Sequence, residues 1–263
     1  TRFFYGFIKE YNMSRKARKQ KCNKYRKNQT NGDNYLRVIQ GGALERQRNT
    51  KVTITPRNFN QDELLGLLED RNINIVFAVG PAGTGKTLIS TLAGIKALKG
   101  NDIDKFVVTR PAVSVDEQHG FLPGTLQEKM APWTRPIMDV FEEYYSPEQI
   151  EYMLNDNKVE IAPLAYMRGR TFKNSFIIAD EMQNATDSQM KMLLTRIGDN
   201  SKIVVTGDLA QHDRGFESNG LKLFIEKLTR TKSDRIKLVQ FNQGDIARHP
   251  VVDEELNIYN DEI

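Results

Sequence analysis

The segment FAVGPAGTGKTLIS, residues 77–90, constrains the fold of this chain more than any other segment. An apolar run ends at Val79, a glycine-rich turn follows, and a helical pattern starts near Thr87. Glycine tolerates the backbone conformations that so tight a turn needs. A strand that leads through a short turn into a helix is typical of a parallel α/β sheet.

The turn matches the pattern G-x-x-x-x-G-K-[ST] in full. Backbone N–H groups of such a loop bind phosphate oxygens, and the N-terminus of the following helix adds the positive end of its dipole. In this chemistry Lys86 binds the β and γ phosphates of a nucleotide, and Thr87 is a ligand of Mg²⁺. The alternative is a glycine turn with a structural role. The predicted nucleotide-binding residues of the loop are Gly80, Pro81, Ala82, Gly83, Thr84, Gly85, Lys86 and Thr87.

A second apolar run, in SFIIADEMQN, ends at the acidic pair Asp180 and Glu181. Asp180 would hold Mg²⁺ through water, and Glu181 would orient or activate an attacking water molecule. This pair is typical of a nucleotide hydrolase and disfavours a small-molecule kinase, in which an activated water next to the γ-phosphate is unwanted. The alternative is an acidic helix N-terminus, which the helix dipole stabilises.

A third apolar run, in KIVVTGDLAQHD, ends near Gly207 and is followed by Asp208 and Gln211. Polar groups at the tip of a strand that lies between two nucleotide-binding strands can contact the γ-phosphate. The pattern G-D-x-x-Q resembles a motif of superfamily 1 helicases with that role. We therefore predict that Asp208 binds nucleotide and that Gln211 takes part in catalysis.

The remaining apolar runs alternate with helical patterns, which predicts an α/β fold with a mainly parallel sheet and helices on both faces. The segment NQDELLGLLED reads as a helix with Leu64, Leu65, Leu67 and Leu68 inward. The predicted strands are 74–79, 105–109, 158–161, 175–179, 202–206 and 235–239. The other predicted helices are 87–99, 126–145, 146–155, 188–197, 221–229 and 251–259.

Residues 1–50 are polar and basic without a sustained period, so we predict that they are disordered and that the folded domain is 51–263. Residues 14–27 carry eight Lys or Arg residues and no acid, whereas the rest of the chain carries 30 basic and 34 acidic residues. The basic segment is either an arm that binds nucleic acid or a solvated leader. Residues 1–12, which precede a methionine, read as an upstream extension.

The composition argues against three features: an internal disulfide, a structural zinc site and a membrane-spanning helix. The single cysteine, Cys22, excludes an internal disulfide and fits a reducing compartment such as the cytoplasm. One cysteine and three dispersed histidines do not provide a structural zinc site. No stretch of 18 consecutive apolar residues occurs, so we expect no membrane-spanning helix.

The order of motifs resembles the PhoH-like family of P-loop ATPases from about Thr55 to Tyr259. The motifs are GPAGTGKT, VVTRPAVS, EQHGFLPGTLQEKMAPWTRPIMD, AYMRGRTF, IIADEMQNAT, TGDLAQHD and DIARHPVV. The resemblance implies a RecA-like P-loop NTPase that uses ATP and Mg²⁺. The chain departs from the family pattern at Asp116 and His119 and in the segment after Gln211, whereas DEMQN in place of the family's common DEAQN is a conservative change.

The resemblance also assigns roles to single residues. Gln61 resembles the glutamine that reads the edge of adenine, although a helix-capping or exposed glutamine would look the same. Arg110, in TRP, resembles a residue that touches nucleic acid, with a surface ion pair as the alternative. Arg168 and Arg170 look like the family's arginines near phosphate or nucleic acid, where the planar guanidinium suits bidentate contacts.

Arg248, in DIARHP, resembles an arginine finger, which stabilises charge on the γ-phosphate in the transition state. The printed sequence ends 15 residues later, without a second RecA-like domain, so we expect Arg248 to act on a neighbouring subunit. That implies a homo-oligomer such as a hexameric ring. The alternative is a structural salt bridge.

These observations favour a Mg²⁺-dependent ATPase whose cycle acts on single-stranded RNA or DNA. The alternative is a nucleotide-binding regulatory protein linked to phosphate starvation, which would not remodel nucleic acid. A kinase is the third class, and Asp180, Glu181 and Gln211 count against it.

Overall fold

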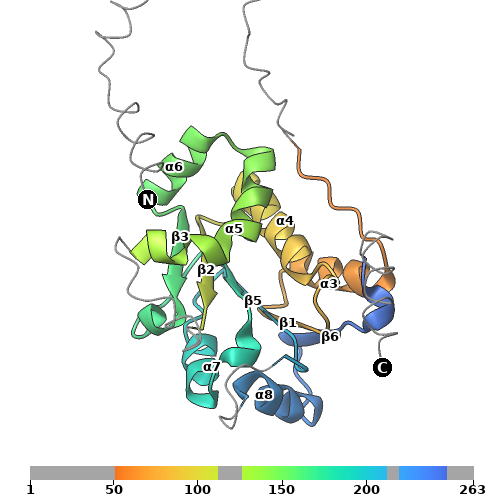
Figure 1. The fold of residues 1–263 in the computed structure, drawn as a ribbon. Coiled ribbons are helices and arrows are strands. Elements are labelled where there is room, and N and C mark those ends of the chain that lie inside the picture. Colours follow the sequence, from red (N-terminus) through yellow and green to blue (C-terminus); the bar gives the residue numbers. More distant parts are fainter. Residues whose placement is uncertain (1–50, 112–125, 212–218, 248–263) are drawn as a thin grey trace, which may run out of the picture. The chain divides into compact units, whose positions relative to one another are not determined.

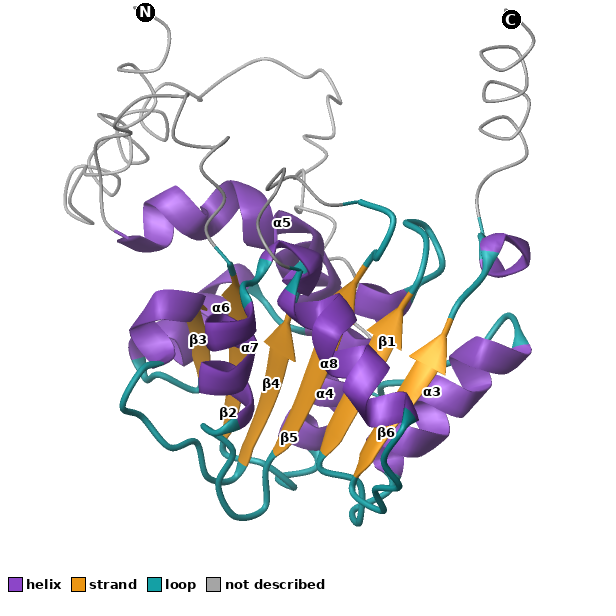
Figure 2. Cartoon of the chain, turned by 90° about the horizontal axis from the view of Figure 1, so that it is seen from below, coloured by secondary structure: helices purple, strands orange, loops and turns teal. Residues whose placement is uncertain are grey.

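Six parallel strands form the sheet of this computed structural model, which describes residues 51–111, 126–211 and 219–247. The strand order is β3-β2-β4-β5-β1-β6, and every neighbouring pair is parallel. All arrowheads in Figure 2 therefore point the same way. The strands are β1 (Ile75–Val79), β2 (Lys105–Arg110), β3 (Val159–Pro163), β4 (Ser175–Ala179), β5 (Lys202–Gly207) and β6 (Ile236–Gln240).

Helices cover both faces of this sheet (Figures 1 and 2). One face packs against α3, α4, α5 and α6, and the other against α7, α8 and two short 3₁₀ helices, η2 and η3. The predicted α/β class with a parallel sheet is confirmed. The helices are α3 (Phe59–Glu69), α4 (Lys86–Lys99), α5 (Leu126–Tyr144), α6 (Pro147–Asn155), η2 (Leu164–Met167), η3 (Met182–Asn184), α7 (Asp187–Leu194), α8 (Gly220–Thr229) and η4 (Gln243–Asp245).

The strand side chains alternate between two apolar cores. In β1, Val76 and Ala78 enter the core under α3 and α4, whereas Ile75, Phe77 and Val79 enter the core under α7 and α8. Burial on both faces explains why these strands read as continuous apolar runs. It also explains why the strands could be found from the sequence, since each boundary lies within two residues of the predicted one.

One detail of the sequence-based prediction is confirmed only in part, and another is wrong. In α3, Leu64 and Leu68 are buried but Leu65 and Leu67 are only partly buried, because residues four apart share one side of a helix and adjacent residues do not. Helix α7 ends at Leu194, three residues before its predicted end. The residues after Leu194 are not helical, and Ile197 forms an isolated β-bridge with Phe172.

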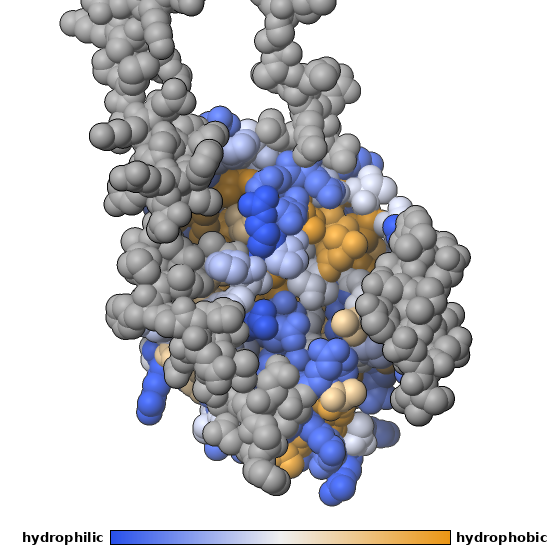
Figure 3. Space-filling model, viewed as in Figure 1, coloured by the Kyte–Doolittle hydropathy of each residue, from blue (hydrophilic) through white to orange (hydrophobic). Residues whose placement is uncertain are grey.

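Other predictions lie outside the described residues, including the helix 251–259 and the disorder of residues 1–50, so the boundary at residue 51 stays a prediction. No helix in the described ranges has the length and apolarity needed to span a bilayer. Where the described residues are visible in Figure 3, hydrophilic side chains lie between separate apolar patches. The large apolar side chains exposed among the described residues are Phe59, Leu88, Tyr152 and Tyr166.

Candidate functional site

The register of the sheet brings the carboxyl ends of β1, β4 and β5 together. Val79 lies opposite Gly207, and Ala179 lies opposite Val205. The glycine-rich loop, the acidic pair and the Gly207–Gln211 segment therefore leave the same edge of the sheet. In parallel α/β sheets, ligands bind outside this edge.

The glycine-rich loop begins at Gly80, which is wedged between two neighbouring segments. Its N–H donates to the carbonyl of Gly207 over 3.1 Å, and its φ is +141°. A Cβ at this position would lie 2.3 Å from the carbonyl oxygen of Phe241, which follows β6. Only glycine fits this turn, which explains the first glycine of the motif.

Lys86 lies at the start of α4, 8% exposed, with its ammonium inside the loop. Its Nζ donates to the carbonyls of Gly80 over 2.7 Å and of Pro81 over 2.6 Å, and to the Thr84 hydroxyl over 3.3 Å. Burial lowers the pKa of Lys86, and the nearby carboxylates oppose this shift. The opposing groups are Asp208, Asp180 and Glu181.

Asp180 joins the acidic segment to the loop and to β5. Its Oδ1 accepts hydrogen bonds from the hydroxyls of Thr87, over 3.1 Å, and of Thr206. Its backbone N–H donates to the carbonyl of Thr109 over 2.9 Å. A carboxylate beside a hydroxyl offers the oxygen ligands that Mg²⁺ prefers, so Thr87 and Asp180 fit the predicted metal site.

Glu181 follows in a left-handed backbone conformation, with φ of 54° and ψ of 37°. Its Oε2 accepts a hydrogen bond from Nε2 of Gln183 over 2.5 Å. Gln183 is buried, and its Oε1 in turn accepts the backbone N–H of Asp208 over 3.2 Å. One amide side chain thus connects the segment after β4 to the tip of β5.

These groups surround a cleft of about 330 Å³. Asp208 lines it, with Oδ1 fixed by the N–H of Ala210 over 3.0 Å, and the exposed Gln211 lies at its rim. Leu88 of α4 and Pro136 of α5 add apolar wall. The remaining lining residues are Ala82, Gly83, Gly85, Lys86, Thr87, Asp180, Glu181 and Gly207.

Gln61 of α3 lies beside the loop rather than in this cleft, and it is 4% exposed. Its Nε2 donates to the carbonyl of Thr84 over 2.9 Å, and its Oε1 accepts the N–H of Arg57 over 2.8 Å. A Cβ on Gly85 would lie 2.8 Å from its Nε2. In this arrangement Gln61 supports the loop, and contact with adenine stays a prediction.

Of the three arginines predicted to touch nucleic acid, Arg110 ends β2, and Arg168 and Arg170 lie in the segment that follows β3 and η2. Arg110 ends β2 opposite Pro163, and Arg168 is exposed just after η2. Arg170 forms a bidentate ion pair with Glu160 of β3, with an Nη2–Oε2 distance of 2.8 Å, and its guanidinium lies 4.5 Å from the ring centroid of Phe172. A nucleic-acid contact of Arg170 would therefore compete with this pair.

Arg248 lies outside the described residues. The residue before it, Ala247, donates its N–H to the carbonyl of Gly83 in the same chain over 3.1 Å. The segment that leads to Arg248 therefore passes the glycine-rich loop of its own subunit.

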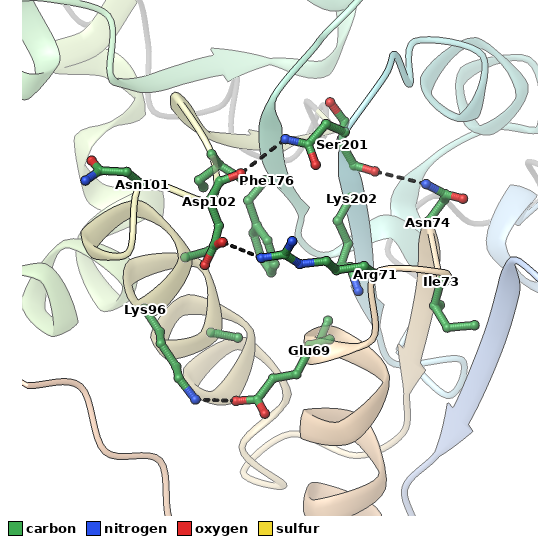
Figure 4. A pocket seen from close by; sticks show the side chains of 15 residues that line it. Glu69, Arg71, Ile73, Asn74, Lys96, Asn101, Asp102, Phe176, Ser201 and Lys202 are labelled. Carbon is green, nitrogen blue, oxygen red and sulfur yellow. Dashed lines mark hydrogen bonds and ion pairs between the residues drawn. The ribbon is translucent and has the colours of Figure 1, made fainter.

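A second cavity, of about 490 Å³, lies at the amino ends of β1, β4 and β5, whereas the glycine-rich loop follows the carboxyl end of β1. Figure 4 shows the side chains that line this cavity. Its charged side chains are already paired: Arg71 with Asp102 over 2.7 Å and Lys96 with Glu69 over 2.6 Å. Lys202 donates to two carbonyls at the end of α3, each over 2.8 Å, and burial lowers its pKa to about 8. These contacts join α3, α4 and β5 structurally.

Sequence reasoning missed Gln183 and Pro136. Gln183 stands in the motif DEMQN, two residues after Glu181, but nothing local shows that its amide reaches β5. Pro136 is one of two prolines inside α5, and helix packing alone brings it to the cleft.

The parallel sheet, the glycine-rich loop after its first strand and the acidic segment beside it define a P-loop NTPase with a RecA-like fold. Residues 53–260 match the model of the PhoH family, described as PhoH-like protein. The chain belongs to this family.

Curated relatives agree with this assignment. The chain is 38% identical over 223 residues to a PhoH-like protein of Synechocystis, which covers 84% of this chain and 66% of the relative. It is 40% identical over 232 residues to Protein PhoH of Escherichia coli, which covers 85% of this chain and 64% of the relative. The chain thus spans about two thirds of the length of these relatives.

Among solved structures, the Pif1 helicase from Candida albicans is similar with a TM-score of 0.38 and 15% identity. The match covers 78% of this chain and 44% of the helicase chain.

Proposed function

We propose that this protein hydrolyses ATP with Mg²⁺ and couples the cycle to the binding or remodelling of single-stranded nucleic acid. The observation that carries the first part is the placement of Asp180 and Glu181 beside Lys86 and Thr87 in one cleft. Each of the four side chains comes from a strand end or helix start, so the sheet holds them in place.

The loop residues would bind the phosphates. The backbone N–H groups at the start of α4 face phosphate oxygens with the positive end of the helix dipole. Lys86 would exchange its carbonyl partners in the loop for the β and γ phosphates. Thr87 and Asp180 would hold Mg²⁺, which neutralises charge on the phosphates when it is bound.

Hydrolysis needs a group that orients water next to the γ-phosphate. Glu181 would accept a proton from this water, and Gln211 at the rim of the cleft would contact the γ-phosphate or the water. Asp208 faces Lys86 in the same cleft and contributes to its electrostatic environment.

Support for a nucleic-acid face comes from the loop 164–172. Leu164 and Met167 anchor it in the core, and Arg170 is fixed by Glu160. The exposed side chains of this loop include Tyr166, which is 62% exposed, and Arg168. An aromatic ring that stacks on a base and an arginine that binds phosphate are the usual components of a single-strand site.

This loop lies at the same carboxyl edge as the cleft but at the far strand of the sheet. Four strand spacings separate β3 from β1, which corresponds to about 19 Å. Arg110 ends the adjacent strand β2 and extends the same face. Nucleic acid would therefore bind beside the nucleotide rather than on it.

The test is an ATPase assay of the purified full chain with and without single-stranded RNA. We expect turnover that RNA stimulates, that Lys86→Ala abolishes, and that Glu181→Gln slows while nucleotide binding remains. Absence of turnover under both conditions would overturn the ATPase proposal. Turnover that no oligonucleotide or salt concentration affects would favour a regulatory nucleotide-binding protein.

A further inference from the structure

Gln183 connects the proposed catalytic glutamate to the tip of β5, where we propose that the γ-phosphate is contacted. Its Nε2 donates to Glu181, and its Oε1 accepts the N–H of Asp208. We propose that Gln183 is a positioning residue that aims the Glu181 carboxylate and makes this aim depend on the position of the β5 tip. This inference rests on the ATPase function proposed above.

The two contacts require an amide of this length. Gln183 is 1% exposed, its partner Asp208 presents a donor, and its partner Glu181 presents a carboxylate acceptor. Only a side chain with both an acceptor and a donor satisfies the two. An ionised glutamate at this position lacks the donor, a methionine lacks both groups, and an asparagine is shorter by one methylene.

The close approach of Gln183 to β5 depends on Gly207. A Cβ at residue 207 would lie 2.8 Å from Oε1 of Gln183 and 2.6 Å from Cδ2 of Leu221. Any larger residue would therefore push the amide away from the strand tip. The glycine of the TGD segment is explained by this contact.

Backbone hydrogen bonds around Glu181 also hold its main chain in place. A left-handed conformation is unfavourable for a residue other than glycine, so the surrounding contacts must maintain it. The N–H of Asp180 donates to Thr109 over 2.9 Å, and the N–H of Asn184 donates to Glu181 over 3.1 Å. With the backbone fixed, the side-chain contact to Gln183 sets where the carboxylate points.

The contacts form a continuous connection from the strand tip to the carboxylate. If Gln211 shifts on contact with the γ-phosphate, its N–H, which donates to the carbonyl of Asp208 over 3.2 Å, moves Asp208 with it. That movement displaces the acceptor end of the Gln183 amide, and the donor end moves Glu181. A misplacement of about 1 Å in such a group can cost about 100-fold in rate. Through Gln183, the orientation of the Glu181 carboxylate thus depends on whether a triphosphate is bound.

The experiment compares Gln183→Met and the nearly isosteric Gln183→Glu with the wild-type full chain. We expect kcat to fall by about 10- to 100-fold. The Kd for a non-hydrolysable ATP analogue should change less than about twofold, because the residue does not line the cleft. The matched control is Gln189→Met, which removes the amide that closes the capping box of α7 but leaves kcat unchanged.

The decisive readout is a double-mutant cycle with Glu181→Gln. If Gln183 acts through Glu181, Gln183→Met should change the residual rate of the Glu181→Gln enzyme by less than about twofold. A full additional loss in that background, or a kcat of wild-type size in both Gln183 variants, would overturn the inference.

Failure of the two proposals is distinguishable. A wild-type chain that binds ATP but never hydrolyses it overturns the ATPase proposal and this inference together. A wild-type chain that turns over, with Gln183 variants that turn over equally well, overturns the inference alone. If the methionine variant does not fold, as judged by thermal unfolding, the glutamate variant decides.

Discussion

The hydroxyl of Thr87 donates a hydrogen bond to Oδ1 of Asp180 over 3.1 Å, although 93 residues separate the two along the chain. The contact joins the first residues of α4 to the end of β4. The contact places the two predicted Mg²⁺ ligands side by side.

The first prediction concerns this pair. Asp180→Asn should raise the Mg²⁺ concentration needed for nucleotide binding by about 10- to 100-fold, because an amide oxygen carries no charge and binds the ion more weakly. Thr87→Ser keeps the hydroxyl and should behave nearly as wild type. The measurement is a Mg²⁺ titration of ATP-analogue binding, and equal titration curves for Asp180→Asn and wild type would contradict the metal assignment.

A second prediction uses two helical glycines in neighbouring helices. Gly94 of α4 faces the sheet, where a Cβ would lie 2.2 Å from Cε2 of Phe106, so Gly94→Ala should lower the free energy of unfolding by about 1–3 kcal/mol. Gly66 of α3 has nothing within 4 Å of its Cβ position, so Gly66→Ala should raise it by about 0.5–1 kcal/mol. Chemical denaturation measures both, and equal effects would refute the packing described for α4.

The third prediction concerns pH. Hydrogen bonds from Arg170, then from Lys105, hold the pKa of Glu160 below its usual range. Because the folded pKa is lower than the unfolded one, the stabilisation is complete above pH about 4.5 and is lost as the pH falls through the folded pKa. Glu160→Gln should therefore cost about 1–3 kcal/mol of unfolding free energy at pH 7, and this cost should decrease progressively as the pH falls below about 4.5.

The matched control for Glu160 is Glu69→Gln. Glu69 pairs with Lys96, but its side chain is 47% exposed, against 16% for Glu160. Solvent screens such a pair, so the control should change the unfolding free energy by less than about 1 kcal/mol. A pH-independent loss in Glu160→Gln would show that the effect is not electrostatic.

A fourth prediction addresses the nucleic-acid face. Tyr166→Ala and Arg168→Ala should each reduce affinity for single-stranded RNA, by about 1–3 kcal/mol for the loss of stacking on the tyrosine. Basal ATP turnover without RNA should stay unchanged, because neither residue lines the cleft. Tyr152→Ala, an exposed tyrosine of α6, is the control. Altered subunit association with intact RNA binding would instead identify a protein interface.

The fifth prediction concerns Arg248. Mixing Lys86→Ala subunits with Arg248→Ala subunits should restore part of the ATPase activity if the arginine acts on a neighbouring subunit. Ala247 contacts Gly83 of its own chain, so action within one subunit is the specific alternative. Failure of the mixture to regain activity, with each variant still assembled, would support that alternative.

Much of the fold could be predicted because its signals are local. The runs that became β1, β4 and β5 are mostly apolar, since both faces of these strands are buried. The end of α7 could not be predicted, because Ile197 leaves the helix to pair with Phe172, which lies 25 residues earlier. Periodicity in one segment carries no information about such a partner.

The sequence by itself determined the glycine-rich loop with Lys86 and Thr87, since the residue types at that spacing suffice to specify a phosphate-binding turn. Only the tertiary structure decided that Arg170 pairs with Glu160 and that Gln183 joins Glu181 to Asp208. The reason is physical: a side chain reaches whatever the strand order and register place beside it, and these depend on contacts across the whole sheet.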